Sequence, residues 1–164
     1  MKRILLLRHA KALPIARGLN DFERGLTEQG SDDCKLLGEY LQSRQITIDL
    51  VISSPANRAK ETAGLVVWSA GLSVEVIYDR RIYEADPQML LDIISEIEPH
   101  RNSVLLVGHN PSMEDFLRGL TGRDEKMSTA TLAQIQSDVE SWTDLSPGNC
   151  VLKSMISARD LPME

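Results

Sequence analysis

The chain has few cysteines, no long basic run and no long hydrophobic run, and each of these features argues against a class of site, partner or cellular location. Cys34 and Cys150 are too few and too far apart to predict a disulfide framework or a CxxC metal clip. The two thiols are therefore expected to be ordinary packed side chains in a reducing compartment. The sequence also shows no internal repeat, low-complexity tract or linker.

Positive charge is scarce and dispersed. The net charge is -6, and no run of Lys and Arg would follow a nucleic-acid backbone or an anionic membrane surface. This distribution argues against nucleic-acid and membrane partners. An acidic protein that binds phosphate must concentrate its cations locally, so the pattern to look for is arginine placed beside histidine.

The amino-terminal apolar run, Ile4 to Leu7, is far too short for a signal-peptide core or a membrane span. A cytoplasmic location is therefore expected. A length of 164 residues with 42% hydrophobic residues predicts one domain, 1–164, large enough to bury its own core. The sequence gives no indication of oligomeric state.

Short apolar runs alternate with helical patterns along the first three quarters of the chain. The runs have the length of buried strands and lie at residues 4–7, 50–52, 74–77 and 104–107. Helices are expected at 28–44 after a Thr27 cap, after Pro55, after an Asp86 cap with Pro87 first, and after an Asn110 cap with Pro111 first, this last one ending at Gly122. Further strands are predicted at 131–136, 139–142 and 150–156.

This alternation predicts an α/β fold: a single three-layer domain with a largely parallel central sheet, helices on both faces and antiparallel edge strands near the C-terminus. Ligands of such sheets bind beyond the carboxyl ends of the strands. Arg8 and His9 follow the first expected strand, and His109 follows the fourth. Arg58 lies near the start of the helix that follows the second strand, so these residues are expected to meet.

Two arginines and two histidines suit a phosphate dianion, because guanidinium groups donate to several oxygens and a neutral imidazole can attack phosphorus. No metal or other cofactor is required. Zinc binding by His9 and His109 is a weaker alternative, since neither belongs to a paired-ligand spacing and no third ligand is evident. His100 has no partner pattern and is expected on the surface. Arg24 is expected either to pair with Asp21 or Glu23 or to be solvated.

Four ordered motifs resemble those of the histidine phosphatase superfamily, whose fold is called phosphoglycerate mutase-like. They are Leu6-Leu7-Arg8-His9-Ala10-Lys11-Ala12, Arg24-Gly25-Leu26-Thr27, Ser53-Ser54-Pro55 with Arg58-Ala59 and Thr62-Ala63, and Gly108-His109-Asn110-Pro111-Ser112. The short chain is similar to the small phosphohistidine phosphatase branch. Ala10 replaces the commoner glycine and Gly25 the commoner proline, and neither change removes a reacting group.

The resemblance implies a role for each site residue. His9 is implied as the phosphorylated nucleophile, Arg8 and Arg58 as ligands of the phosphoryl oxygens, and His109 as a donor to the phosphoryl group. Arginine neighbours are expected to help keep His9 neutral, because like charge disfavours the imidazolium. Glu84 is the candidate acid, since relatives with alcohol leaving groups place a carboxylate in this region.

The implied activity is that of a metal-independent phosphatase with a phosphohistidine intermediate. Larger relatives roof the pocket with inserted helices, and residues 12–28 leave little room for one, so a histidine-phosphorylated protein is the expected substrate. The alternatives are a small-metabolite phosphomonoester phosphatase of the same fold and an inactive phosphate-binding regulator.

Overall fold

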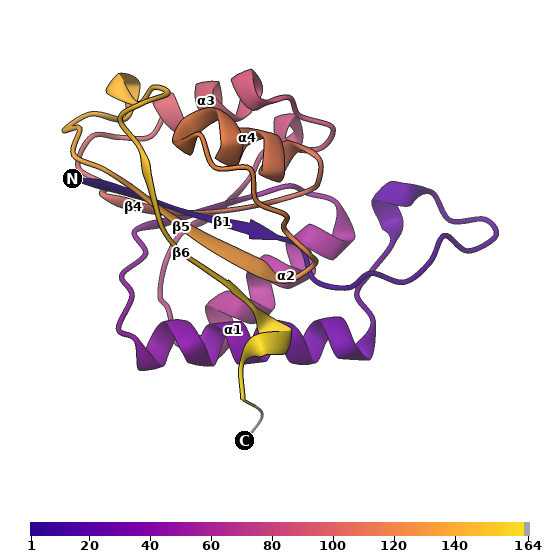
Figure 1. Cartoon of the computed structure of the whole chain (residues 1–164). Coiled ribbons are helices and arrows are strands. Elements are labelled where there is room, and N and C mark those ends of the chain that lie inside the picture. The colour runs from indigo at the N-terminus through magenta and orange to yellow at the C-terminus, as the bar shows by residue number, and fades with distance from the viewer. Residues whose placement is uncertain (163–164) are drawn as a thin grey trace.

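A central six-stranded sheet organises the computed structural model, which describes residues 1–162 (Figure 1). The strands are β1 (Lys2–Arg8), β2 (Leu50–Ser53), β3 (Val76–Tyr78), β4 (Ser103–Gly108), β5 (Thr131–Ser137) and β6 (Val151–Ser157). The helices are α1 (Glu28–Ser43), α2 (Asn57–Ser69), α3 (Pro87–Ser95) and α4 (Ser112–Thr121). Four short 3-10 turns are η1 (Asp21–Glu23), η2 (Arg80–Ile82), η3 (Trp142–Asp144) and η4 (Ala158–Asp160).

The strand order is β3-β2-β4-β1-β5-β6. The first four strands in this order are mutually parallel, whereas β5 and β6 are antiparallel to their neighbours. Helices α1 and α2 cover one face and α3 and α4 the other (Figure 1). The predicted three-layer α/β fold with antiparallel strands at one edge is therefore confirmed.

Strand β1 is buried on both faces, which explains its continuous apolar run. Successive side chains of a strand point to opposite faces. Leu5 and Leu7 accordingly pack in the cluster under α1 and α2, while Ile4 and Leu6 pack in the cluster under α3 and α4. The strand that leads to His9 is therefore packed against helices on both faces of the sheet.

Three expected helix boundaries are confirmed. Thr27 caps α1 by accepting from the Gly30 N–H, Asp86 caps α3 by accepting from the Met89 N–H, and Gly122 ends α4 in the left-handed region at φ 74°. The Asn110 cap was wrong, because α4 begins at Ser112 with Pro111 as its cap residue. The Asn110 amide instead donates to Glu114 and to the Met127 carbonyl.

The strand predicted at 139–142 was also wrong. The strand that follows β5 along the chain and pairs with it is β6, and the segment between the two contains the short turn η3. Trp142 accounts for the difference, since its side chain is 1% exposed and its indole N–H donates to the Arg101 carbonyl at 2.7 Å. Its burial in the core under α3 and α4 outweighs the alternating pattern that favoured a strand.

None of the helices within residues 1–162 has the length and apolarity needed to cross a lipid bilayer. Cys34 and Cys150 are buried free thiols, as expected. Burial raises the pKa of Cys34 to about 12, so this thiol is not a nucleophile at neutral pH.

Candidate active site

Three neighbouring parallel strands end at the same edge of the sheet and carry the predicted site residues. Arg8 of β1 lies opposite Gly108 of β4, and the His9 N–H donates to the Gly108 carbonyl at 3.1 Å. The Ser54 N–H, just beyond β2, donates to the Val107 carbonyl of β4 at 3.0 Å. The ends of β1, β4 and β2 are therefore tied together, as the sequence predicted.

His9 is 7% exposed and lies just past the end of β1. Its Nδ1 lies 2.8 Å from the Ala10 carbonyl oxygen. Because a carbonyl oxygen only accepts, Nδ1 carries the ring hydrogen and Nε2 keeps its lone pair in the neutral ring. The backbone N–H of Ala10 donates to the Thr62 hydroxyl at 3.0 Å, which fixes the acceptor carbonyl to α2.

Burial, together with the positive charges of Arg58, Arg8 and Arg24, lowers the pKa of His9 to about 4, although the hydrogen bond to the Ala10 carbonyl opposes this shift. The expected neutral state follows from this environment, although burial rather than arginine is its main cause. A neutral imidazole at pH 7 has the lone pair that a nucleophile needs.

His109 lies beside His9 at the end of β4. The two ring centroids are 5.2 Å apart with the planes inclined at 55°. The Ser54 hydroxyl contacts His109 Nε2 at 2.8 Å, and Ser54 Oγ also accepts from the Ala56 N–H. Burial lowers the pKa of His109 to about 3, and repulsion from Arg58 and from His9 in its protonated form acts in the same direction, so the His109 ring is also neutral at pH 7.

The two arginines flank the histidine pair. Arg58, 5% exposed in the first turn of α2, donates to the Asp21 carbonyl at 2.7 Å and to the Asp21 carboxylate at 2.9 Å. Arg8 donates to the Met127 carbonyl at 3.0 Å. The Nε atoms of both arginines and Nδ1 of His109 are buried and have no hydrogen-bond partner among residues 1–162. The arginine Nε atoms are N–H donors, and Nδ1 of His109 donates in the tautomer that carries its hydrogen there, so this set fits the oxygens of a phosphoryl group.

The chain matches the sequence profile of the Histidine phosphatase superfamily (branch 1) over residues 4–91. This match covers more than half of the sequence. The chain belongs to this superfamily. An uncharacterized protein of Mycobacterium tuberculosis is 27% identical to it over 89% of this chain and 96% of its own length.

Solved structures of the superfamily share the whole fold. A protein of Agrobacterium tumefaciens, with the proposed identity of phosphohistidine phosphatase SixA, is 29% identical with a TM-score of 0.83, covering 95% of this chain and 97% of its own. The protein histidine phosphatase SixA in complex with tungstate is 22% identical with a TM-score of 0.84, covering 96% and 98%. Mycobacterial glucosyl-3-phosphoglycerate phosphatase is 18% identical with a TM-score of 0.69, covering 93% and 97%. These likenesses support a phosphatase of the SixA type.

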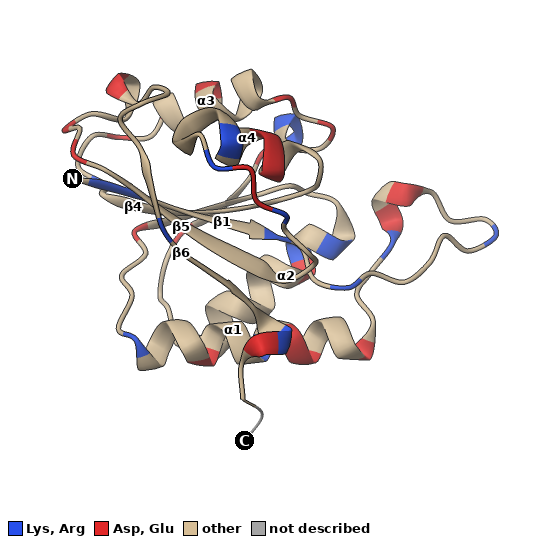
Figure 2. Cartoon of the chain, in the orientation of Figure 1, with Lys and Arg blue, Asp and Glu red and all other residues tan. Residues whose placement is uncertain are grey.

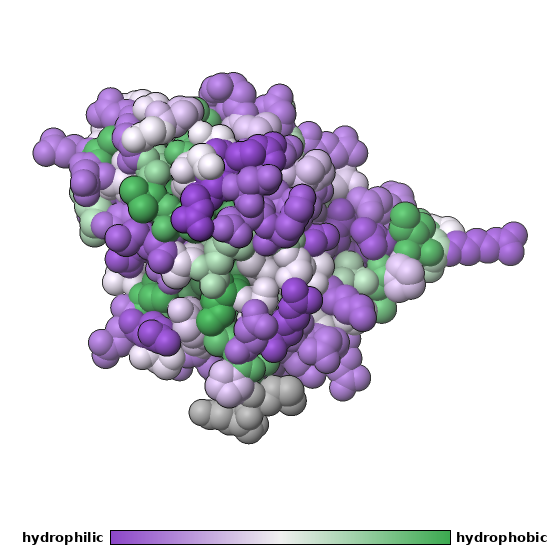
Figure 3. All heavy atoms as spheres, viewed as in Figure 1, coloured by the Kyte–Doolittle hydropathy of each residue, from purple (hydrophilic) through white to green (hydrophobic). Residues whose placement is uncertain are grey.

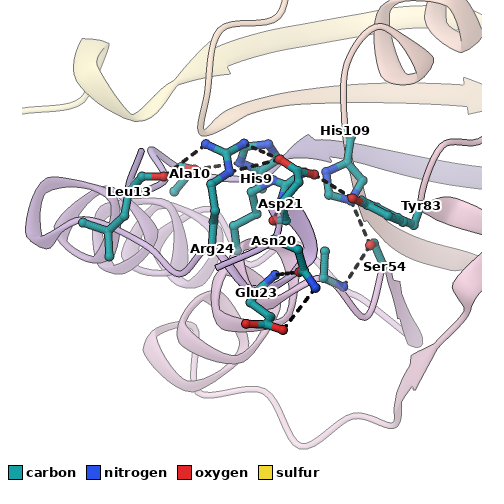
Figure 4. Close-up of polar contacts among 12 residues, drawn as sticks. His9, Ala10, Leu13, Asn20, Asp21, Glu23, Arg24, Ser54, Tyr83 and His109 are labelled. Carbon is teal, nitrogen blue, oxygen red and sulfur yellow. Dashed lines mark hydrogen bonds and ion pairs between the residues drawn. The ribbon is translucent and has the colours of Figure 1, made fainter. Parts of the chain in front are cut away.

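Asp21 is central to the site, yet the sequence indicated it only as a partner of Arg24. Its carboxylate lies 2.9 Å from Arg24 and 2.9 Å from Arg58, and it accepts from the Tyr83 hydroxyl at 2.6 Å (Figure 4). The Tyr83 hydrogen bond, with those of the two arginines, lowers the pKa of Asp21 to about 2. Of the alternatives for Arg24, pairing with Asp21 is the one observed. Only the three-dimensional contact reveals that the same carboxylate also holds Arg58.

Glu84 is exposed and follows Tyr83 with a left-handed φ of 61°. The Tyr83 ring meets His109 edge-on, with centroids 5.5 Å apart, so it is this aromatic side chain that lines the histidine pair. The acid role of Glu84 stays a prediction. His100 lies on the surface as expected, with 70% of its side chain exposed. Within residues 1–162 no cluster of three or more His, Cys, Asp or Glu side chains is arranged to hold a metal ion.

Proposed function

We propose that the protein removes phosphoryl groups from protein-borne phosphohistidine through a phospho-His9 intermediate, without a metal ion. The observation that carries the proposal is the Nδ1 hydrogen bond of His9 to the Ala10 carbonyl, which leaves Nε2 unprotonated, with Arg58 and Arg8 near enough to lower the pKa of the ring. The likeness to SixA phosphohistidine phosphatases supports it. Because tungstate is a tetrahedral oxyanion, its binding by one of them supports a site for a phosphoryl group.

In the first step, the Nε2 lone pair of His9 attacks phosphorus in line with the departing nitrogen. The Nε2–P bond forms as the substrate P–N bond breaks, and the bonding pair leaves with the substrate ring. Arg8 and Arg58 donate to the phosphoryl oxygens. Ser54 can donate its hydroxyl hydrogen to His109 Nε2, because its oxygen already accepts from Ala56; His109 Nδ1 then carries the hydrogen that stabilises the transition state.

In the second step, water attacks the phosphorus of phospho-His9. The Nε2–P bond breaks and its electron pair returns to Nε2, while the phosphate leaves as dihydrogen phosphate, which carries the oxygen and both hydrogens of the water. The hydrogen stays on His9 Nδ1 throughout and keeps its hydrogen bond to the Ala10 carbonyl, so the ring returns to the same tautomer. Each turnover therefore restores the nucleophile.

The leaving group favours phosphohistidine over phosphate esters. A protonated phosphohistidine ring departs as neutral imidazole, whereas an alkoxide needs a proton in the transition state. Because the phosphohistidine ring leaves already protonated, this substrate does not require a strong acid at Glu84, which is exposed. A cytoplasmic location also stays a prediction.

The deciding experiment measures phosphate release from a histidine-phosphorylated carrier protein and from an aryl phosphate, with a metal chelator present. We expect the wild type and the surface control His100→Ala to act on the carrier, and folded His9→Ala to be inactive. Retained turnover in His9→Ala would remove the nucleophile assignment. Release from the ester alone would indicate a metabolite phosphatase, and release from neither would indicate a phosphate-binding regulator.

The variant Glu84→Gln tests whether Glu84 acts as the proton donor, through its activity on the phosphate ester compared with its activity on phosphohistidine. If Glu84 donates a proton to the leaving group, the variant should lose more activity on the ester than on phosphohistidine. Equal rates for variant and wild type on both substrates would remove Glu84 from the mechanism.

A further inference from the structure

A projecting loop beside the site carries an unusual concentration of exposed hydrophobic side chains. Residues 13–20, here called the arm, extend from the body of the molecule between β1 and η1 (Figure 1). Within residues 1–162, three of the nine exposed large hydrophobic side chains lie on this arm: Leu13, 48% exposed, Ile15, 65%, and Leu19, 41%. Hydrophobic atoms accordingly cover much of the projection in Figure 3.

The arm is anchored at its base to the phosphate-binding groups. The Leu13 N–H donates to the Gly25 carbonyl at 2.8 Å, and Arg24 donates to the Leu13 carbonyl at 3.1 Å. Arg24 also pairs with Asp21, whose carboxylate holds Arg58. The base of the arm is therefore linked through Arg24 and Asp21 to Arg58 of the candidate site.

The charge around the arm differs from that of the whole chain. Residues 8–24 carry four cations, Arg8, Lys11, Arg17 and Arg24, against two acids, Asp21 and Glu23, although the net charge of the chain is -6. Positive charge marks the tip of the arm in Figure 2. Both acids contact neighbours within the loop, Asp21 through Arg24 and Glu23 through Asn20. Within residues 13–20, Arg17 is the one charged side chain, so the arm presents apolar groups and a positive charge to a negatively charged partner.

We propose that the arm docks the protein substrate: Leu13, Ile15 and Leu19 contact apolar surface beside the phosphorylated histidine, and Arg17 meets acidic groups there. This inference rests on the proposed phosphohistidine phosphatase activity. A metabolite-sized substrate engages the buried arginines and histidines, whereas exposed side chains on a projection can contact only a ligand with an extended surface. The arm therefore determines specificity for proteins and leaves the chemical step unchanged.

The test compares a histidine-phosphorylated carrier protein with free phosphohistidine as substrates. The variant carries Leu13→Ser, Ile15→Ser and Leu19→Ser together. Trp68→Ser is the matched control, since Trp68 is 72% exposed at the far end of α2 from Arg58, about 15 Å along the helix axis. The altered side chains are exposed, so all variants should keep the wild-type circular dichroism spectrum.

We expect the triple variant to lose at least about tenfold in kcat/KM on the carrier, mainly through KM, and to stay within about twofold of wild type on free phosphohistidine. Trp68→Ser should match wild type on both. The docking role of the arm would be refuted if the triple variant lost equal activity on both substrates or lost activity on neither. It would also be refuted if the wild type showed no preference for the carrier. Loss of a wild-type dimer or of vesicle binding in the triple variant would assign the arm to self-association or to a membrane instead. A wild type that hydrolyses neither substrate would refute the proposed activity itself.

Discussion

At the scale of the residue, the site depends on hydrogen bonds to two neutral histidines. The Ala10 carbonyl selects the tautomer of His9, and the Ser54 hydroxyl contacts Nε2 of His109. Neither contact involves a charged partner. The Ala10 contact places the ring hydrogen of His9 on Nδ1 and leaves Nε2 free to attack. Donation by Ser54, as proposed above, places the ring hydrogen of His109 on Nδ1.

Ser54→Ala should therefore lower kcat about tenfold to a hundredfold, because it leaves His109 Nε2 buried without its partner. KM should change little, since both arginines remain. Ser53→Ala is the matched control: Ser53 is equally buried, but its hydroxyl donates to the Ser54 carbonyl. Steady-state kinetics of both variants make the comparison, and an equal fall in kcat would show that Ser54 has only a packing role.

At the scale of the element, the position of α2 matters because it carries Arg58 and Thr62 to the site. Helix α1 packs against α2, with a close approach between Gly38 of α1 and the C-terminal end of α2. A Cβ added there would lie 2.5 Å from the Ser69 side chain and 2.8 Å from the Ala70 nitrogen. Since real Cβ atoms essentially never come this close to backbone, the two helices would have to separate.

We expect Gly38→Ala to lower the free energy of unfolding by about 1–3 kcal/mol. Gly64→Ala should raise it by about 0.5–1 kcal/mol, because Gly64 lies in the interior of α2 with nothing within 4 Å of an added Cβ. Urea denaturation measures both. A Gly38→Ala protein as stable as wild type would contradict the close helix contact.

At the scale of the whole molecule, two buried neutral histidines make stability depend on pH. Their folded pKa values, about 4 for His9 and about 3 for His109, lie below the unfolded value of about 6.5. Below pH 6.5 the unfolded chain therefore binds more protons than the folded one. Stability is complete above pH 6.5 and decreases as the pH falls toward the folded values.

The free energy of unfolding should decrease from pH 6.5 to pH 5 by up to about 1.4 kcal/mol per pH unit for each histidine. Asp21 contributes little to the slope in this window, because its unfolded value of 3.8 and its folded value of about 2 both lie below pH 5. Urea denaturation at several pH values measures the slope. The variant His9→Gln with His109→Gln should show a flatter slope than wild type, and identical slopes would contradict the lowered pKa values.

Much of the architecture was predictable because it depends on local sequence. Buried strands read as continuous apolar runs, and caps such as Thr27 and Asp86 are encoded within four residues of the helices they begin. The motifs placed the candidate residues His9 and His109 just beyond the ends of β1 and β4, and the structure brings these two rings together. Asp21 was not predicted as a ligand of Arg58, because that pair joins residues 37 positions apart. The strand expected at 139–142 failed because Trp142 packs in the core.

Strand β1 has a consequence for how the protein is made. It emerges from the ribosome before any of its partners, yet its neighbours in the sheet are β4 and β5, which begin at Ser103 and Thr131. At about 5–20 residues per second, on the order of ten seconds of translation separate β1 from β5. During that interval Arg8 and His9 are already synthesised, but the histidine pair and its enclosing sheet are not. A nascent chain therefore acquires the proposed nucleophile early and the complete candidate site only near the end of synthesis.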